Sequence, residues 1–433
     1  MHIHDLIGIG FGPSNIALAI ALQEERQAGH RPIDAFFIEK QAGFSWHPGM
    51  LLGHAHMQIS YLKDLATLRN PRSRFTFVNY LHEQGRLPDF INLKSFFPSR
   101  HEFSDYLGWA ARQFDDICAY AEEVIEVLPE QKDGHVPLLR VRSRDQRGAV
   151  RDRLARNLVV SVGGTPKVPD CFKKLAGEAR VFHSNGYLTG IAANRHAHKV
   201  AIIGGGQSAA EIFVDLHNRA EPTDVDLIMR GRALHPSDDS PFVNGIFNAD
   251  FTDHMFQQDE STRAKLLQEF HRTNYAAPDL ELIQQIYKIL YEQRVVRGDR
   301  HHLLRRHEVV SANARADGVE LVLRDLDQNM ELTRRYDAVV LATGYERENH
   351  KPLLTPLARH LGDLQVDRNY RLRSATEFQP AIFLQGACEG SHGLSDTLLS
   401  VTAVRVKEII DALGSSTARK PGASTEKFAA AAT

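Results

Sequence analysis

Two glycine-rich turns, each between an apolar segment and a helical pattern, constrain the fold of this chain more than any other feature. The first, Gly8-Ile-Gly-Phe-Gly-Pro13, ends an apolar segment at residues 4–10 and leads into a helical pattern at 14–28. The second, Gly204-Gly-Gly-Gln-Ser-Ala209, joins residues 199–204 to a helical pattern at 207–219. A strand, a glycine turn and a helix in this order let the backbone approach a pyrophosphate at the helix N-terminus. The sequence therefore predicts an α/β protein with two Rossmann-like dinucleotide-binding domains.

The first turn is suited to the adenosine end of a dinucleotide. It has glycines at Gly8, Gly10 and Gly12, but Pro13 replaces the third glycine of the G-x-G-x-x-G pattern. Glu39 follows the next predicted strand, residues 35–38, where a carboxylate can bind ribose hydroxyls. The alternative is a tight turn followed by a surface acid.

The second turn differs in the charge that follows its next strand. An NAD site normally has an acid there, whereas this chain has Arg230, with Arg232 two residues later. A cation can pair with a 2′-phosphate, which favours NADP over NAD; the alternative is a solvated arginine. Two such domains in one chain predict one cofactor held permanently and one that visits, a flavin and a nicotinamide dinucleotide.

The rest of the chain completes a multidomain organisation, as expected for 433 residues. Two further apolar strands, 158–162 and 338–342, end in glycine, as strands that face a ligand often do. Residues 236–300 are helical in pattern, with an apolar face in their second half. Residues from 414 onward have no apolar periodicity, which predicts a disordered tail.

Composition and charge exclude several classes of partner. The formal net charge is -2 and no long run of Lys and Arg occurs, so nucleic acid is not an expected partner. The longest apolar stretches are far shorter than the roughly 20 residues of a membrane span. No signal segment is recognisable, so a cytoplasmic location is expected. The three cysteines, Cys118, Cys171 and Cys388, are too far apart for a CxxC pair, which disfavours a disulfide reductase.

The histidines His47, His56, His183 and His392 have no metal-ligand or catalytic-triad spacing. We therefore expect neither a metal site nor a dedicated catalytic side chain among them, and interpret most of them as structural.

A set of longer motifs is more specific. They are GIGFGPSN at 8–15, FSWHPGM at 44–50, MQISYLKD at 57–64, LRNP at 68–71, FVNYLH at 77–82, GGQSAAE at 205–211, DSPFVN at 239–244, TNY at 273–275, ATGYE at 342–346 and HGLSDTLLS at 392–400. With these motifs, residues 5–413 resemble the microbial N-hydroxylating flavoprotein monooxygenases, most closely the L-ornithine N5-monooxygenases of hydroxamate siderophore synthesis. That family shares the Pro13 departure.

The resemblance implies three sets of site residues. FAD would contact Gly8, Gly10, Gly12, Pro13, Glu39, Lys40, Gln41, Ala42, Gly43, Phe44, Ser45, Trp46, His47, Gln58, Val124, Thr397, Leu398 and Leu399. NADPH would contact Gly204, Gly206, Gln207, Ser208, Ala209, Arg230, Asn274, Tyr275 and Ala276. The substrate would contact Lys63, Asn244, Gly245, Ile246, Phe247, Asn274 and Ser400.

These residue types suit an amino-acid substrate. Lys63 offers a cation to an α-carboxylate, Ser400 adds a donor, and the asparagine amides can both donate and accept. Each also has a simpler interpretation: Lys63 could pair with Asp64, Asn244 and Asn274 could be turn residues, and Ser400 could face its own helix. Ser395 is expected to cap the helix that runs to Leu413, with amides that favour negative charge on a reduced flavin.

The predicted domains are an FAD-binding domain at 1–192 and 342–413, an NADPH-binding domain at 193–236 and 300–341, a small, mostly helical substrate-binding insert at 237–299, and a tail at 414–433. By resemblance, NADPH reduces FAD, O2 adds to give a C4a-hydroperoxyflavin, and the substrate amine takes the distal oxygen. Relatives of this kind are commonly homotetramers. Alternatives are L-lysine or a diamine such as putrescine as substrate, or a flavin- and NADPH-binding redox sensor without turnover.

Overall fold

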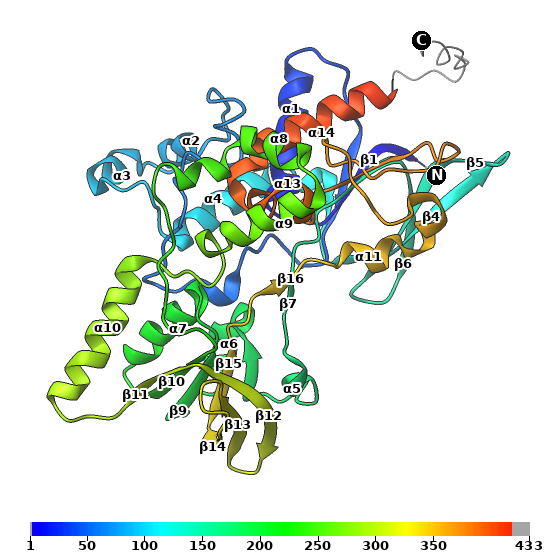
Figure 1. The fold of residues 1–433 in the computed structure, drawn as a ribbon. Helices are drawn as coiled ribbons and strands as arrows, with labels where there is room; N and C mark the ends of the chain where they lie inside the picture. Colours follow the sequence, from blue (N-terminus) through cyan, green and yellow to red (C-terminus); the bar gives the residue numbers. More distant parts are fainter. Residues whose placement is uncertain (1, 418–433) are drawn as a thin grey trace, which may run out of the picture.

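The computed structural model describes residues 2–417 and contains two sheets of the predicted α/β type (Figure 1). The first sheet has seven strands in the order β3-β2-β1-β6-β5-β4, with β17 also paired to β6. Its strands are β1 Ile3–Ile9, β2 Ala35–Ile38, β3 Cys118–Ala119, β4 Glu122–Lys132, β5 His135–Asp145, β6 Val150–Val160 and β17 Ala381–Leu384. Strands β3, β2, β1, β6 and β17 are parallel, and β4 to β6 form an antiparallel meander.

Two long helices pack together beside this sheet, α1 Pro13–Gln27 and α14 Thr402–Thr417. The first half of α1, from Asn15 to Ala21, is buried without interruption, because this part of the helix is enclosed by the sheet and by α14. Three more helices belong to this unit (Figure 1), and the longest of them contacts α1. They are α2 Phe77–Glu83, α3 Leu87–Leu93 and α4 Arg100–Arg112.

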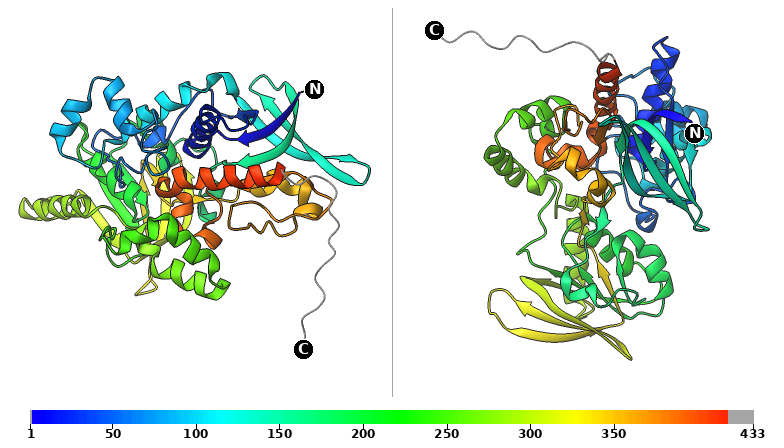
Figure 2. Two further views of the ribbon diagram at one scale, coloured as in Figure 1. Left: turned by 90° about the horizontal axis from the view of Figure 1, so that it is seen from above. Right: turned by 90° about the vertical axis from the view of Figure 1, so that its right-hand side faces the viewer.

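The second sheet is entirely parallel, in the order β11-β10-β9-β15-β8. Its strands are β8 Val181–His183, β9 Lys199–Ile203, β10 Asp224–Met229, β11 His301–Arg305 and β15 Ala338–Leu341. Successive side chains of a strand point to opposite faces. Thus Val200 and Ile202 share a core with α7 Gln207–His217, whereas Ala201 packs against the antiparallel sheet of β12 His307–Arg315, β13 Gly318–Asp325 and β14 Glu331–Tyr336. Figure 2 shows this smaller sheet at the outer end of the second unit.

The segment between β10 and β11 is helical, as predicted. It contains η4 Val243–Phe247, α8 Ala249–Gln257, α9 Glu260–Glu269, η5 His271–Thr273 and α10 Leu280–Val295. Helices α8 and α9 contact α13 Glu389–His392 of the first unit. Helix α10 instead packs on α7 through Leu282, Ile286 and Ile289, so its predicted apolar face belongs to the core of the second unit.

The remaining short elements include one strand pair at the connection between the units. Strand β7 Thr165–Pro166 pairs with β16 Tyr345–Glu346 where the chain crosses between the two sheets (Figure 1). The others are η1 Pro48–Met50, η2 Asp115–Ile117, α5 Asp170–Lys173, η3 Ser184–Gly186, α6 Tyr187–Ala193, α11 His350–Leu354, η6 Thr355–Leu357, α12 Ala358–Leu361, η7 Leu394–Thr397 and η8 Leu399–Val401.

The α/β class and the parallel Rossmann-like sheets are confirmed, and two boundaries differ from prediction. The second sheet already includes β8, before the expected boundary at residue 193, because a three-residue strand leaves no periodic signal. The terminal helix runs to Thr417, so the predicted tail does not begin at 414; residues 418–433 lie outside the described part. Within residues 2–417 no helix has the length and apolar character of a membrane span.

Candidate active site

The first glycine turn fits a pyrophosphate group. Gly10 has φ +82°, and a Cβ there would lie 2.5 Å from the Ser161 carbonyl oxygen at the end of β6, so only glycine permits this approach. Gly12 is the N-cap of α1, with no side chain bonded to the helix amides and open space around its Cα. The first amides of α1 are therefore available to an anion. Pro13 fits because the first helical position needs no N–H donor.

Glu39 lies beside this turn at the end of β2. Its carboxylate accepts hydrogen bonds from the backbone amides of Phe11 at 2.8 Å and Gln41 at 2.9 Å, which fix its position between the turn and the following loop. That loop carries the candidate residues 40–47, which range from exposed to half-buried. Val124 is buried on β4, a strand that contacts β2.

The second turn has the same construction. A Cβ on Gly204, which has φ +145°, would lie 2.2 Å from the Ala342 carbonyl oxygen after β15. Gly206 is the N-cap of α7 and has no side-chain cap. The Cα of Ala276 would lie 3.5 Å from a Cβ at Gly206, so residues 274–276 of the helical segment meet the turn. The structure thus brings the two parts of the predicted NADPH set together.

The two arginines after β10 have different surroundings. Arg232 donates to both carboxylate oxygens of Asp327, at 3.0 and 2.9 Å, and Arg306 binds the same carboxylate at 3.0 Å. Arg230 is exposed, and the ion pairs found within residues 2–417 do not include it. Arg230 is therefore the available cation at this strand end, and Arg232 is not, because its partner arrives from the β13–β14 turn.

A hydrogen-bond network through Asp279 connects Gln58 of the first unit with the second glycine turn. The Asp279 carboxylate accepts from the Gln58 side chain at 2.9 Å and from the Gln207 side chain at 2.8 Å, and its amide donates to Gln207 at 2.9 Å. Nearby, the Tyr275 hydroxyl donates to Glu389 at 2.5 Å. Burial raises the pKa of both groups, that of Tyr275 to about 12. The helical segment is thus bonded to candidate cofactor residues of both units.

Lys63 does not pair with Asp64, which excludes its simpler interpretation. The Asp64 carboxylate points inward and accepts from the amides of Ala66, Thr67 and Phe77 at 2.9, 2.6 and 2.7 Å. Lys63 is half-buried, and burial lowers its pKa. Its Nζ lies 5.8 Å from the centre of the Phe247 ring.

Phe247 belongs to η4, which also carries other predicted substrate residues. Element η4, which also holds Gly245 and Ile246, contacts η7. Ile246 lines a small apolar cavity together with Met255, Phe270 and Leu394. Asn244 behaves as a turn residue, since its side-chain amide donates to the Asp239 carbonyl at 2.7 Å and its backbone amide donates to Ser240. Asn274, after η5, is half-buried.

Elements η7 and η8 each contain a buried hydroxyl. Ser395 and Ser400 are 1% and 2% exposed, and neither hydroxyl has a hydrogen-bond partner among the described residues. Thr397, Leu398 and Leu399 lie between them and are half-buried. The predicted capping by Ser395 is wrong, because η7 and η8 intervene and α14 begins only at Thr402. The sequence pattern did not separate these two short 3-10 turns from the start of α14.

Sequence reasoning missed a buried ion pair that holds this segment. Arg405 and Asp396 have side chains 1% and 0% exposed, and Arg405 Nη1 lies 2.9 Å from the Asp396 carboxylate. Arg405 also donates to the Ser14 hydroxyl at the start of α1, at 2.9 Å. Asp396 lies within the HGLSDTLLS motif, but the isolated Arg405 gives no comparable signal in the sequence. The pair fixes η7 against the first glycine turn.

The arrangement can be compared with known proteins. A family model described as L-lysine 6-monooxygenase/L-ornithine 5-monooxygenase matches residues 2–347. The chain belongs to this family. A relative in the family, the L-ornithine N(5)-monooxygenase of Pseudomonas aeruginosa, is 49% identical over 415 residues, covering 95% of this chain and 94% of the relative.

Solved structures extend the agreement to the fold. Ornithine hydroxylase from Pseudomonas aeruginosa matches with a TM-score of 0.93 and 48% identity, over 96% of this chain and all of that chain. The ornithine N-hydroxylase of Kutzneria sp. 744, with reduced FAD, NADP+ and L-ornithine, matches with a TM-score of 0.91 and 36% identity, over 96% of this chain and all of that chain. The predicted family and the monooxygenase class are confirmed.

Proposed function

We propose that this monooxygenase converts L-ornithine, O2, NADPH and a proton into N5-hydroxy-L-ornithine, water and NADP+, as a step in hydroxamate siderophore synthesis. The observation that most supports an amino-acid substrate is Lys63, a half-buried cation beside Phe247 that has no ion pair in the described region. FAD suits the first turn with Glu39, and NADPH suits the second turn with Arg230 and residues 274–276. A homotetramer and a cytoplasmic location remain predictions.

The cofactors divide the chemistry. FAD, once reduced by NADPH, supplies the activation of O2. The residues of the chain bind, orient and desolvate. Lys63 holds the α-carboxylate by a charge-assisted hydrogen bond, and the Ser400 hydroxyl is a buried donor that has no hydrogen-bond partner within residues 2–417.

The amine must lose its proton before it can accept oxygen. An alkylamine has a pKa of about 10.4 in water, and transfer to an apolar environment favours its neutral form. Phe247, beside Lys63, supplies an apolar wall for the proposed substrate site. Desolvation at this wall therefore replaces a dedicated side-chain base, and the same wall excludes water from the reacting centre.

Product formation with three amines tests the substrate. L-Lysine adds one methylene, and putrescine lacks the carboxylate that Lys63 would bind. Hydroxylated product is measured by mass spectrometry, with oxygen and NADPH consumption recorded in parallel. We expect ornithine to exceed lysine in kcat/KM by roughly 10- to 200-fold, the effect of one methylene. Faster hydroxylation of lysine or putrescine would overturn ornithine as the substrate, and absence of oxygen consumption would favour a redox sensor.

A further inference from the structure

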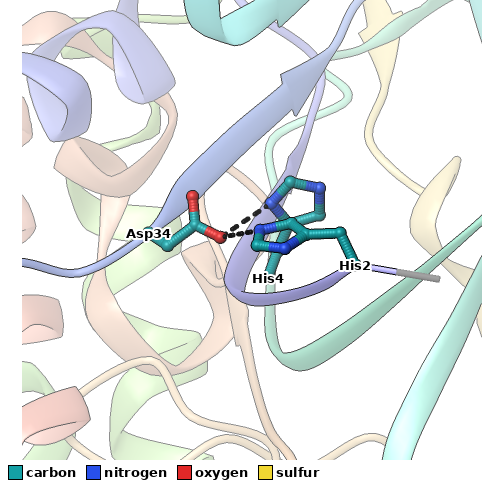
Figure 3. Close-up of side chains that lie close together, drawn as sticks. All are labelled: His2, His4 and Asp34. Carbon is teal, nitrogen blue, oxygen red and sulfur yellow. Dashed lines mark hydrogen bonds and ion pairs between the residues drawn. The ribbon is translucent and has the colours of Figure 1, made fainter.

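The amino-terminal ends of β1 and β2 bring together two histidines and an aspartate. His2 and His4 alternate with Ile3, so their rings project to the same side of the chain. Asp34 directly precedes β2. Its Oδ2 lies 2.6 Å from His2 Nε2 and 3.0 Å from His4 Nδ1, as Figure 3 shows. Within residues 2–417 this is the one group of three such side chains whose ligand atoms all lie within 4.8 Å of one another.

The donor set has the chemistry of a transition-metal site. Two imidazole nitrogens and one carboxylate oxygen are ligands of Zn²⁺ and similar ions, with bonds of about 2.0–2.2 Å. The His2 side chain is 70% exposed and can turn to close the remaining distance, whereas His4 is only 15% exposed. His4 also stacks on Phe36 with ring centres 5.2 Å apart, which orients one ligand in advance.

Charges around the cluster are largely paired. The Arg153 guanidinium lies 5.0 Å from the centre of the Phe36 ring and is bound by Glu122 at 2.9 Å. Asp5, which accepts from the Asp34 amide at 3.3 Å, is paired with Arg156 at 3.5 Å.

We propose that His2, His4 and Asp34 bind one divalent transition-metal ion at the surface, with a fourth position open to water. The ion would join β1 to β2 at their amino-terminal ends. The opposite ends of the same strands carry the Gly10 turn and Glu39, so the site is a structural clip remote from the proposed reaction. An ion bound only by the folded chain stabilises that chain.

Titration of the untagged full-length chain with Zn²⁺, after chelator treatment, tests the site. Calorimetry measures affinity and stoichiometry, and melting with Zn²⁺ or with EDTA measures the metal-dependent change in Tm. The test variants are His2→Ala/His4→Ala and Asp34→Asn. The matched control is His135→Ala/His196→Ala, which removes two exposed histidines from other surfaces.

We expect one ion per wild-type chain and a higher Tm in Zn²⁺ than in EDTA. Loss of a direct ligand should weaken binding by more than the roughly 10- to 100-fold typical for loss of a ligand's hydrogen-bond partner. The Zn²⁺-dependent rise in Tm should disappear in both test variants and persist in the control. Absence of one-to-one binding by the wild type, or unchanged binding by His2→Ala/His4→Ala, would overturn the site. Neither result depends on flavin or on turnover.

Discussion

Arg100 on α4 of the first unit binds Glu211 on α7 of the second through two hydrogen bonds, at 2.9 and 2.7 Å. The Arg100 side chain is 13% exposed and that of Glu211 only 2%, so water screens the pair little. Glu211 also accepts from Gln207 at 2.9 Å, and Gln207 in turn binds Asp279. A continuous polar connection therefore runs from one unit through the second glycine turn to the helical segment.

Glu211→Gln leaves the buried Arg100 guanidinium without its opposite charge. Breaking a buried pair on one side typically costs about 3–5 kcal/mol, so we expect a clear decrease of Tm in thermal unfolding. Asp317→Asn is the control, because the Asp317–Arg335 pair is 65% and 53% exposed and should contribute less than about 1 kcal/mol. Equal effects of the two substitutions would contradict the structural importance of the inter-unit pair.

Asp279→Asn should slow the reduction of FAD by NADPH. The new amide group faces one of the two glutamine donors, so one hydrogen bond to a charged acceptor, worth about 1.5–3 kcal/mol, is lost. Stopped-flow measurement of flavin absorbance against NADPH concentration gives the rate, which we expect to fall roughly tenfold or more at low NADPH. Asp116→Asn, at an exposed position of the first unit, is the control. An unchanged reduction rate would remove Asp279 from cofactor positioning.

Lys63→Ala should raise the ornithine KM by roughly 10- to 100-fold, because a charge-assisted hydrogen bond to the substrate carboxylate is lost. FAD content and NADPH oxidation without substrate should be unaffected. In the wild type, burial lowers the Lys63 pKa, so ornithine binding should weaken as pH rises through that lowered value. Steady-state kinetics across pH measures both effects, with Lys288→Ala, on the exposed side of α10, as control. Loss of flavin from Lys63→Ala would contradict a substrate role.

Arg230→Ala should raise the KM for NADPH and leave that for NADH unchanged. The lost contact with a 2′-phosphate is worth about 1.5–3 kcal/mol, or roughly 10- to 100-fold in KM. Arg232→Ala should change the KM for NADPH relative to that for NADH less than Arg230→Ala does, because Asp327 already binds the Arg232 side chain. The measurement is the KM for NADPH and for NADH in both variants. An equal rise of both KM values in Arg230→Ala would show that Arg230 does not recognise the 2′-phosphate.

Acid should destabilise the chain in part through His392. Its ring is fully buried and stacks on Tyr370 with centres 4.1 Å apart, and burial lowers its pKa from 6.5 to about 4. The unfolded chain then binds a proton that the folded chain does not. Stability from this group is present above pH 6.5 and falls by about 3 kcal/mol as pH decreases to 4.

The test is Tm between pH 7.5 and 4. His392→Phe keeps a ring beside Tyr370 but cannot titrate, so its Tm should fall less steeply with pH than that of the wild type. His135→Ala, at an exposed site, should keep the wild-type slope. Parallel curves for His392→Phe and the wild type would assign the acid sensitivity to other groups.

Much of the fold follows from local patterns. Strand β2 and the start of β9 have the expected bounds, and α1 and α7 begin within one residue of prediction. These elements are long or apolar enough to leave a periodic signal, and each glycine turn needs residues that only a few sequences supply. The structure explains why these turns need glycine, because a Cβ at Gly10 or Gly204 would collide with the carbonyl oxygen at the end of a neighbouring strand. Local sequence patterns do not show which neighbouring strand supplies that carbonyl oxygen.

The sequence by itself determined the two strand–turn–helix units, the α/β class and, through its motifs, the family. Only the tertiary structure decided which charged groups are available. Asp64 turns inward to three backbone amides, so Lys63 has no ion pair among residues 2–417, whereas Asp327 reaches Arg232 from another sheet and leaves Arg230 exposed. The Arg405–Ser14 hydrogen bond and the Asp279 network likewise join segments far apart in the chain. The physical reason is that periodicity reports contacts within one element, while the pairing of charges depends on how separate elements pack.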